Sequence, residues 1–588
     1  MCNHKWTLFF LILTFTQYGS QAQQIYLVGG NIVNVKDGKV EKNMTIVIED
    51  SVIRKIEKSN PKLKIPATAT VINLDGKYIM PGMIDSHIHF YQSGGLYTRP
   101  DHINVPNIYS YEKDQQWISD NREDIMRRYL ACGITTVMDM GGPMSNFEVR
   151  KYCNQSPVSP NALVTGPLIS TYAPPNFDKN DPPVIKVNNE EEAIGEVRRQ
   201  LPFHPDYIKI WFIVSASQSA EKSLPIIKAI VEESHKNNLK VLVHATQLHT
   251  ATLAVEAGCD ILVHSVSDSL VEPSFIQLLK AKNTTLITTL KVREMGNEVS
   301  TQQMYFTTHD LRHGNPFMLG TLFDLQHIPA KEVGFDYMDM RTKRQIPSKQ
   351  DSNMLVNCKL LNDAGINIVA GTDAGNPGVE HAASYLDELI AMNQAGLTNA
   401  QVLRAATINA AKGFGIENRL GNIEENKLAD LLILKNNPFE NLQNLDSIYL
   451  MVHRGRLINT DSLIKQTPAS IVQQQFNAYN AHDFDEFFNL YSDSIVISNG
   501  DTVFVRGKQQ MRKLYQSLFT TETFLHSQLL NRMTYGNTVT DLESTEAISG
   551  KLLKHHISKG LAIYLVNKNK IDKVTLIRIE RIDFPANQ

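Results

Sequence analysis

The sequence predicts an α/β protein built around a (β/α)8 barrel of the TIM type, with a small composite β-sandwich domain and a C-terminal α+β domain. Two observations predict the barrel. From Tyr78 to about Ile416 short apolar runs alternate with helical stretches, and eight such runs can be counted. Of the 588 residues, 42% are hydrophobic and 20% are charged. That balance excludes a disordered, collagen-like or coiled-coil protein.

The apolar runs that predict barrel strands are short and are separated by stretches long enough for a helix. Neighbouring parallel strands need a crossover connection, usually a helix, so this repetition indicates βα units that close into a barrel. We therefore expect residues 83–416 to form the barrel. The runs cover residues 78–84, 135–138, 162–164, 207–212, 241–243, 261–263, 285–290 and 366–370.

Alternating strand patterns flank the barrel segment on both sides. Short alternating runs lie between residues 24 and 75, and two more, 429–434 and 450–457, follow the barrel. We expect residues 23–82 and 417–465 to pair into one composite β-sandwich domain. Around residues 466–470 the composition becomes linker-like, and residues 470–588 then show a helix and several alternating strands, which predicts a separate α+β unit.

The chain starts with the features of a secretory signal peptide. Lys5 precedes an apolar run from Thr7 to Phe15, and Ser20 and Ala22 are the small residues of a cleavage site. The run is shorter than the roughly 20 apolar residues that span a bilayer. We predict that residues 1–22 are a signal peptide and that cleavage near Ala22 exports the protein to the periplasm or the extracellular space, with no membrane contact afterwards.

Charge and cysteine content narrow the range of partners. The formal net charge is −3, which provides no electrostatic basis for binding nucleic acid or an acidic membrane surface. Five cysteines without a CxxC pair do not make a disulfide framework. We expect the four that remain after cleavage to be buried apolar residues, and we expect the partner to be a small-molecule substrate. These four are Cys132, Cys153, Cys259 and Cys358.

Potential metal ligands follow several of the predicted strands. His87 and His89 lie two residues apart, so they point to the same face of a strand and can chelate one cation. His244, His264 and Asp373 each end or follow another apolar run. Because barrel enzymes build their sites at the carboxyl ends of the strands, we expect these five side chains to converge. Four histidines and one carboxylate suit Zn²⁺ or a similar divalent cation.

Lys209 is the one charged residue in the apolar run 207–212. Burying an unpaired ammonium costs several kcal/mol, so this lysine must be neutralised, paired or modified. A carbamate formed with CO₂ would turn it into an anionic ligand that bridges two metals. The alternative is an ordinary paired or snorkelling lysine beside a single metal.

The motifs around these residues resemble the amidohydrolase superfamily, and most of all its imidazolonepropionase and prolidase-like branch. The stretch IMPGMIDSHIH at 79–89 is similar to the opening signature of that superfamily. Further similar stretches occupy the positions of its second, fifth, sixth and eighth strands and of its closing segment. They lie at 133–139, 243–245, 263–265, 371–375, 405–411, 421–434 and 453–455.

The resemblance implies a two-metal hydrolase. One metal would be held by His87, His89 and Asp373, and the other by His244 and His264. Carboxylated Lys209 and a hydroxide would bridge two divalent metals, for which Zn²⁺ is the first choice. Asp373, the general acid and base, and His264 would take part in catalysis.

The resemblance predicts a metal-dependent hydrolase that cleaves a C–N (amide) bond of a small substrate. One alternative is a mononuclear hydrolase or deaminase acting on a cyclic amide or amidine. A second is a non-catalytic binding protein on the same scaffold.

Residues outside the ligand set have weaker functional signals. His381, a short loop after Asp373, and Tyr172, in the third strand-to-helix loop, are candidate substrate-binding residues. We expect His249 to be structural. The long stretch 291–349 between the last two predicted strands is a candidate lid, because loops in this position open on the catalytic face.

The C-terminal unit resembles the NTF2-like (SnoaL-like) cone fold. The similar stretches are 476–483, 487–491, 506–507 and 562–564. In that superfamily a curved sheet encloses a pocket that in some members binds a small molecule and in many supports dimerisation. We expect this unit to support a homo-oligomer, with His526 and Arg532 as the residues that would serve a pocket.

Overall fold

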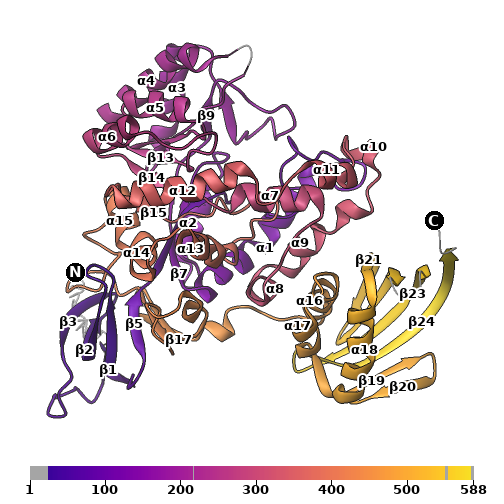
Figure 1. Cartoon of the computed structure of the whole chain (residues 1–588). Helices are drawn as coiled ribbons and strands as arrows, with labels where there is room; N and C mark the ends of the chain where they lie inside the picture. The colour runs from indigo at the N-terminus through magenta and orange to yellow at the C-terminus, as the bar shows by residue number, and fades with distance from the viewer. Residues whose placement is uncertain (1–23, 216–217, 550–553, 585–588) are drawn as a thin grey trace, which may run out of the picture.

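A computed structural model describes residues 24–215, 218–549 and 554–584 (Figure 1). The predicted signal peptide, residues 1–22, lies outside the described residues. The fold has a central α/β part, a small sheet on one side of it, and a C-terminal α+β unit on the other side (Figure 1). None of the helices in the described ranges is long and apolar enough to cross a membrane.

The central part is a ring of parallel strands. A three-stranded sheet in the order β6-β7-β8 and a seven-stranded sheet in the order β10-β9-β11-β12-β13-β14-β15 make up the ring. A hydrogen bond from Ser86 N to Ala370 O (3.1 Å) joins β6 to the end of β15, and one from Asp206 N to Val164 O (2.9 Å) joins β8 to the segment before β11. The ring strands are β6 (Met83–Ile88), β7 (Ile134–Asp139), β8 (Asn161–Val164), β9 (Leu168–Ser170), β10 (Val184–Lys186), β11 (Ile208–Trp211), β12 (Val241–His244), β13 (Ile261–Val263), β14 (Thr285–Ile287) and β15 (Ile368–Val369).

Alternation along the ring strands separates two apolar cores. In β12, Val241 and Val243 pack with the surrounding helices, whereas Leu242 packs with Ile261 and Ile287 inside the ring. Helices connect the strands and cover the outside of the ring. They are α1 (Tyr111–Ala131), α2 (Asn146–Gln155), α3 (Glu190–Gln200), α4 (Ala220–Lys236), α5 (Leu248–Glu256), α6 (Pro273–Lys282), α12 (Lys349–Asp363), α13 (Ser384–Gln394), α14 (Asn399–Ala405) and α15 (Ile408–Phe414).

The first predicted barrel strand is divided in the structure, which corrects the prediction of one run over 78–84. Residues Tyr78–Pro81 form β5, which belongs to the small sheet, and β6 begins only at Met83. Gly82 lies between the two strands, where an added Cβ would come within 2.1 Å of Thr135 Oγ1. The backbone therefore passes too close to β7 for any other residue, and the chain changes sheets at this glycine.

Strands from both sides of the barrel segment share the small sheet. Its order is β18-β17-β16-β5-β1-β2-β3, with β4 paired to β1. Ile25, Ile46, Ile79 and Ile433 are among the residues of its own apolar core. The remaining bounds are β1 (Gln24–Asn34), β2 (Lys39–Glu49), β3 (Val52–Lys58), β4 (Thr70–Asn73), β16 (Leu431–Leu434), β17 (Ile448–His453) and β18 (Arg456–Ile458).

The C-terminal unit packs helices against a six-stranded sheet in the order β20-β19-β24-β23-β22-β21. Phe487, Ile495 and Val539 are buried in its core. Its elements are α16 (Pro468–Asn480), α17 (Phe484–Asn489), β19 (Tyr491–Asn499), β20 (Thr502–Arg506), α18 (Lys508–Thr521), β21 (Glu522–Tyr535), β22 (Thr538–Ser549), β23 (Lys554–Asn567) and β24 (Lys570–Phe584).

The stretch 291–349 is helical and joins the central part to the C-terminal unit (Figure 1). On one side the Arg128 guanidinium of α1 donates to Gly314 O (2.8 Å). On the other, Asn477 Nδ2 of α16 donates to Pro316 O (2.7 Å), and Arg312 pairs with Glu486 (2.7 Å). The helices are α7 (Val292–Thr301), α8 (Thr308–His313), α9 (Pro316–Thr321), α10 (Ala330–Val333) and α11 (Tyr337–Lys343).

Candidate active site

Three polar side chains, two from β6 and one from the residue after it, point into the end of the ring. Asp85, His87 and His89 are two residues apart, so they lie on the same face, while Ile88 packs into the outer core. All three polar side chains are buried. Since polar groups are rarely buried without partners, this row indicates a built site rather than core packing.

The ligand candidates from separate strands converge on one carboxylate. Nε2 of His87 and Nε2 of His89 lie 3.1 Å and 3.2 Å from the same Asp373 Oδ1, and His264 Nε2 lies 3.9 Å from Asp373 Oδ2. The His244 ring lies 4.5 Å from that of His264, measured between ring centroids. The structure therefore brings all five together at the carboxyl ends of the strands.

Contacts behind the ligands orient two of the imidazoles. Nδ1 of His89 is 2.8 Å from Gly141 O, and Nδ1 of His264 is 2.6 Å from Thr289 Oγ1. The Asp139 carboxylate accepts from Gly141 N (2.9 Å) and so holds the segment that carries the Gly141 carbonyl. With Nδ1 engaged, each ring presents Nε2 to the centre.

Asp85 connects the segment of His87 to the segment that carries Asp373. It accepts hydrogen bonds from His87 N (3.1 Å), Thr372 N (3.1 Å) and Thr372 Oγ1 (2.7 Å). Next to Thr372, Asp373 has a φ of +65°, and His264 has a φ of +74°. Left-handed backbone at a non-glycine residue costs on the order of 1–3 kcal/mol, and such strain gathers at functional sites.

Burial and neighbouring charges set the protonation of the ligands. Burial lowers the pKa of His87 and of His244 to about 3, and it lowers the pKa of His264 well below its usual range. Burial alone would raise the pKa of Asp373, but His87 and His89 outweigh it and hold that pKa well below its usual range. Neutral imidazoles and a charged carboxylate are the states in which these groups bind metals.

Lys209 lies on the inner face of β11, two residues before Trp211, at which the strand ends. Alternation places Lys209 and Trp211 on this face and Ile208 and Ile210 in the outer core. Lys209 is 1% exposed and forms no ion pair within the described part of the chain. Burial lowers the pKa of Lys209 to about 7. A neutral amine is the form that reacts with CO₂, so this environment suits the predicted carbamate.

A cavity of about 190 Å³ opens above these groups. Apolar and aromatic side chains form much of its wall, and Arg99 is the one guanidinium among the described lining residues. Arg99 donates to Asn376 Oδ1 (2.7 Å), and Asn376 Nδ2 donates to Asp373 O (3.0 Å). The lining residues are His87, His89, Tyr91, Gln92, Arg99, Leu168, Phe177, Val184, Lys209, Trp211, Ile213, His244, His264, Asp373 and Asn376.

Three residues considered in the sequence lie outside this lining. His381 is buried behind it, with Nε2 2.7 Å from Gln92 O and Nδ1 2.7 Å from the Tyr129 hydroxyl. Tyr172 is 44% exposed and contacts the cavity only through the Trp211 ring, 5.9 Å away between centroids. His249 is exposed and pairs with Glu221 (2.7 Å). His381 and Tyr172 are therefore not among the described residues that line the cavity.

The stretch 291–349 supplies none of the described cavity-lining residues. Its helices pack between α1, α13 and α16 instead, which does not support the expectation that it is a lid. The four cysteines are all buried and free, as expected.

Sequence reasoning missed several residues that shape the site. Asp85 and Asp139 had a signal, because both are carboxylates within or at the end of apolar strands. Arg99 and Thr289 had none, since the first lies in a loop and the second is an unremarkable threonine until the fold brings it to His264.

The donor set fits a divalent cation. Asp373 Oδ1 and His87 Nδ1 are buried and make no hydrogen bond, and two Nε2 atoms point at that same oxygen. His87, His264 and Asp373 each present a ligand atom within 4.8 Å of the others. The cluster of imidazoles and one carboxylate lies at the carboxyl ends of a ring of parallel strands. This arrangement is typical of a barrel protein with a candidate metal site.

The chain belongs to the amidohydrolase family, whose profile matches residues 78–458. An imidazolonepropionase from Fusobacterium nucleatum is 24% identical over 458 residues, which is 72% of this chain and 91% of that protein. A dihydroorotase from Carboxydothermus hydrogenoformans is 38% identical over 74 residues, only 13% of this chain and 16% of its own length.

A solved structure has a similar fold. The crystal structure of a Xaa-Pro dipeptidase with bound methionine superposes with a TM-score of 0.57 and 21% identity, and the match covers 74% of this chain and all of that one. The chain therefore has an imidazolonepropionase among its relatives, and the solved structure supports the mixed α/β fold predicted from the sequence.

Proposed function

We propose that this protein is a metal-dependent amidohydrolase that cleaves a C–N (amide) bond of a small substrate. The observation that carries the proposal is the approach of His87 Nε2 and His89 Nε2 to within 3.1 and 3.2 Å of one Asp373 oxygen. Two imidazole nitrogens this close to one buried carboxylate oxygen, on a carboxyl whose pKa is held well below its usual range, suit a shared cation.

Two divalent cations, with Zn²⁺ as first choice, would occupy the site. His87, His89 and Asp373 would hold one, and His244 and His264 the other, with carboxylated Lys209 between them. When bound, such cations lower the pKa of water from about 16 to around 7 and polarise a substrate carbonyl.

The chain's own residues handle the proton and the substrate. Asp373 accepts the proton of the attacking water and passes it to the leaving nitrogen, which is the role of a general acid and base. Arg99, the guanidinium in the cavity wall, forms a bidentate ion pair with Asp101 (2.6 and 2.7 Å), and its remaining N–H groups would donate to a carboxylate of the substrate. Phe177 and Trp211 offer aromatic surface for an apolar group.

The size of the cavity points to a small substrate. A volume of about 190 Å³ accepts a molecule of dipeptide size or smaller. Candidates of this size are a dipeptide ending in proline, an N-acyl amino acid and a cyclic imide-like ring, and the first two also carry a carboxylate for Arg99.

A second candidate is a mononuclear hydrolase or deaminase acting on a cyclic amide or amidine. It is favoured by the ligand atoms of His87, His264 and Asp373, which lie within 4.8 Å of one another and could hold one cation without His244. Metal content separates the two candidates.

The test combines elemental analysis with a screen of Xaa-Pro dipeptides, N-acyl amino acids, lactams and cyclic amidines. We expect two equivalents of metal that are lost when His87→Ala and Asp373→Asn are combined, and loss of turnover in either single variant. His249→Ala is the matched control, because that histidine is exposed and pairs only with Glu221 on the surface. Undiminished rates in either ligand variant would contradict the proposal.

We also propose that the C-terminal unit is an NTF2-like cone through which the protein forms a homo-oligomer, and that the mature chain is exported. The six-stranded sheet with three helices supports the first, and the N-terminal sequence supports the second. In this unit His526 Nε2 contacts His327 Nε2 (2.8 Å) and Arg532 pairs with Asp541, so both are engaged in packing. Light scattering and N-terminal sequencing of the secreted protein test these proposals.

A further inference from the structure

A second cluster of metal-ligand side chains lies where three parts of the fold meet. Cys132 directly follows α1, His309 and His313 lie on α8, and Asp446 ends the short helix Leu442–Asp446. Residues four apart on a helix share a face, and the two imidazole centroids are 4.3 Å apart. Cys132 Sγ and one nitrogen of each histidine all lie within 4.8 Å of one another.

Both imidazoles are oriented from behind through Nδ1. Nδ1 of His309 is 3.0 Å from Asp446 Oδ1, and Nδ1 of His313 is 3.1 Å from His309 O. Nε2 of His309 is buried without a hydrogen-bond partner, and Nε2 of His313 lies 3.8 Å from Asp446 Oδ1. A carboxylate or backbone carbonyl on the far nitrogen is the usual support of a metal-binding histidine.

We propose that Cys132 Sγ, His309 Nε2 and His313 Nε2 bind one Zn²⁺ ion, with Asp446 orienting His309. Sulfur and imidazole ligands of this kind suit zinc. The bound ion would stabilise the fold and would not take part in catalysis. It ties the end of α1 to α8, and α8 in turn contacts the C-terminal unit through Thr308 Oγ1 to Asp483 (2.9 Å) and through Arg312 to Glu486.

Cobalt substitution tests this site apart from the active site. The proposed active-site ligands contain no sulfur, so a thiolate-to-Co²⁺ charge-transfer band in the Co²⁺-loaded full-length protein reports Cys132 alone. We expect the band in the wild type and in His87→Ala. In Cys132→Ser and in His313→Gln we expect the band to disappear and the metal content to fall by one equivalent. Both variants should also have a lower thermal unfolding temperature than the wild type.

Two results would overturn the proposal. One is a wild type without the charge-transfer band, and the other is a Cys132→Ser variant that keeps the band. Should Cys132→Ser fail to fold, His313→Gln reports the same loss of one metal equivalent without touching the cysteine. Failure of the active-site proposal would instead appear as unchanged metal content in His87→Ala, so the two failures are distinguishable.

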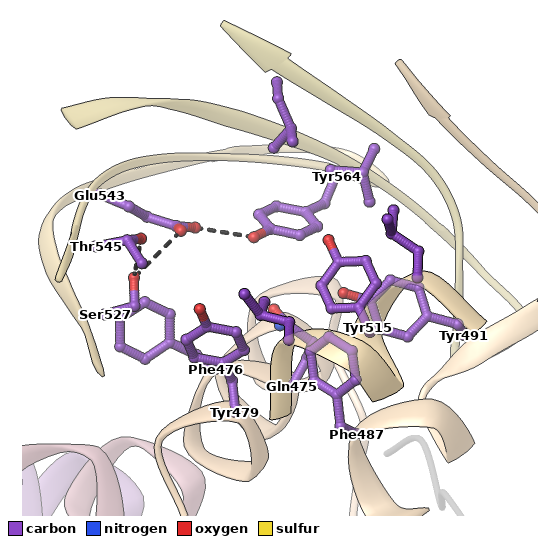
Figure 2. A pocket seen from close by; sticks show the side chains of 14 residues that line it. Gln475, Phe476, Tyr479, Phe487, Tyr491, Tyr515, Ser527, Glu543, Thr545 and Tyr564 are labelled. Carbon is purple, nitrogen blue, oxygen red and sulfur yellow. Dashed lines mark hydrogen bonds between the residues drawn. The ribbon is translucent and has the colours of Figure 1, made fainter. Parts of the chain in front are cut away.

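An independent observation points to a ligand site in the C-terminal unit. A cavity of about 520 Å³ lies between the helices and the sheet, and Figure 2 shows aromatic rings surrounding it. Glu543 of β22 is the one charged residue among its described lining residues. The aromatic lining residues are Phe476, Tyr479, Phe487, Tyr491, Tyr515 and Tyr564.

The Glu543 carboxylate faces this cavity with only neutral partners. It accepts from the Tyr564 hydroxyl (2.8 Å), with Ser527 Oγ 3.5 Å away (Figure 2). Burial raises the pKa of Glu543 to about 7. Arg532, whose charge acts on Glu543, is occupied by Asp541 in a bidentate pair.

We infer that the cavity binds an organic ammonium ion with an apolar body. Aromatic faces attract cations, and a carboxylate in an aromatic enclosure without a cation of its own completes a site for one. The ammonium would lie against Glu543 and the rings would cover the rest of the molecule.

Calorimetry with a matched pair of probes tests this inference. We expect 2-phenylethylamine, as its ammonium ion, to bind at least tenfold more tightly than 2-phenylethanol, which has nearly the same shape and no charge. Glu543→Gln should remove the preference. Glu546→Gln is the control, because Glu546 lies on the same strand but pairs with His555 outside the cavity. Equal binding of the two probes, no binding of either, or an unchanged preference in Glu543→Gln would overturn the inference.

Discussion

Replacing the hydroxyl of Thr289 tests whether contacts behind the candidate metal ligands determine their affinity for metal. This hydroxyl is the Nδ1 partner of His264, at 2.6 Å, and the side chain is fully buried. Thr289→Val removes the hydroxyl and keeps the shape and the β-branch. Loss of such an orienting partner typically lowers metal affinity or activity by about 10- to 100-fold, which is about 1.4–2.7 kcal/mol.

The assay is a Zn²⁺ titration against a competing chelator, which needs no known substrate, followed by kcat/KM once one is found. Global stability should fall by only about 1 kcal/mol, the net value of one hydrogen bond. Thr289→Ser keeps the hydroxyl and should retain the metal affinity of the wild type. A folded Thr289→Val protein with unchanged affinity and rate would refute the argument that this contact orients His264.

Three further predictions concern other parts of the molecule. Arg99→Gln should raise KM at least tenfold for substrates with a carboxylate and leave neutral substrates unaffected; equal effects on both would argue against its binding role. Phe487→Ala should destabilise the C-terminal unit by about 3–5 kcal/mol, because the ring is 1% exposed, and calorimetry should show that unit unfolding first. Burial raises the pKa of Glu380 to about 8, so its contribution to stability is complete below its unfolded pKa and is lost as the pH rises through about 8. Between pH 5 and 9 the thermal unfolding temperature should therefore decline less steeply in Glu380→Gln than in the wild type.

The strand pattern was readable because parallel strands buried on both faces are continuous apolar runs. The runs at 241–243 and 261–263 coincide with β12 and β13 to within one residue. The first run misled because Tyr78–Pro81 and the apolar start of β6, Met83 and Ile84, follow each other closely, and hydrophobicity does not tell which sheet a strand joins. The close approach of Gly82 to Thr135, a contact between distant residues, decided the division.

The site was readable in part for a similar reason. His87, His89, His244, His264 and Asp373 stand at strand ends, and parallel strands bring their ends to one rim. His381 has an equally suggestive place in the sequence, yet its ring is buried against Gln92 and Tyr129. A loop position does not determine the direction of a side chain, because that direction depends on packing against other elements.

The amino-acid sequence by itself determined the period of the strands, the set of candidate metal ligands and membership in the amidohydrolase family, since these depend on residue type and local spacing. Tertiary structure alone decided which side chains share a cavity with that set. Arg99, Thr289 and Glu543 acquire their surroundings from segments far away in the chain, and no local pattern encodes contacts between such segments. The same holds for Cys132, whose neighbours on α8 lie more than a hundred residues further along.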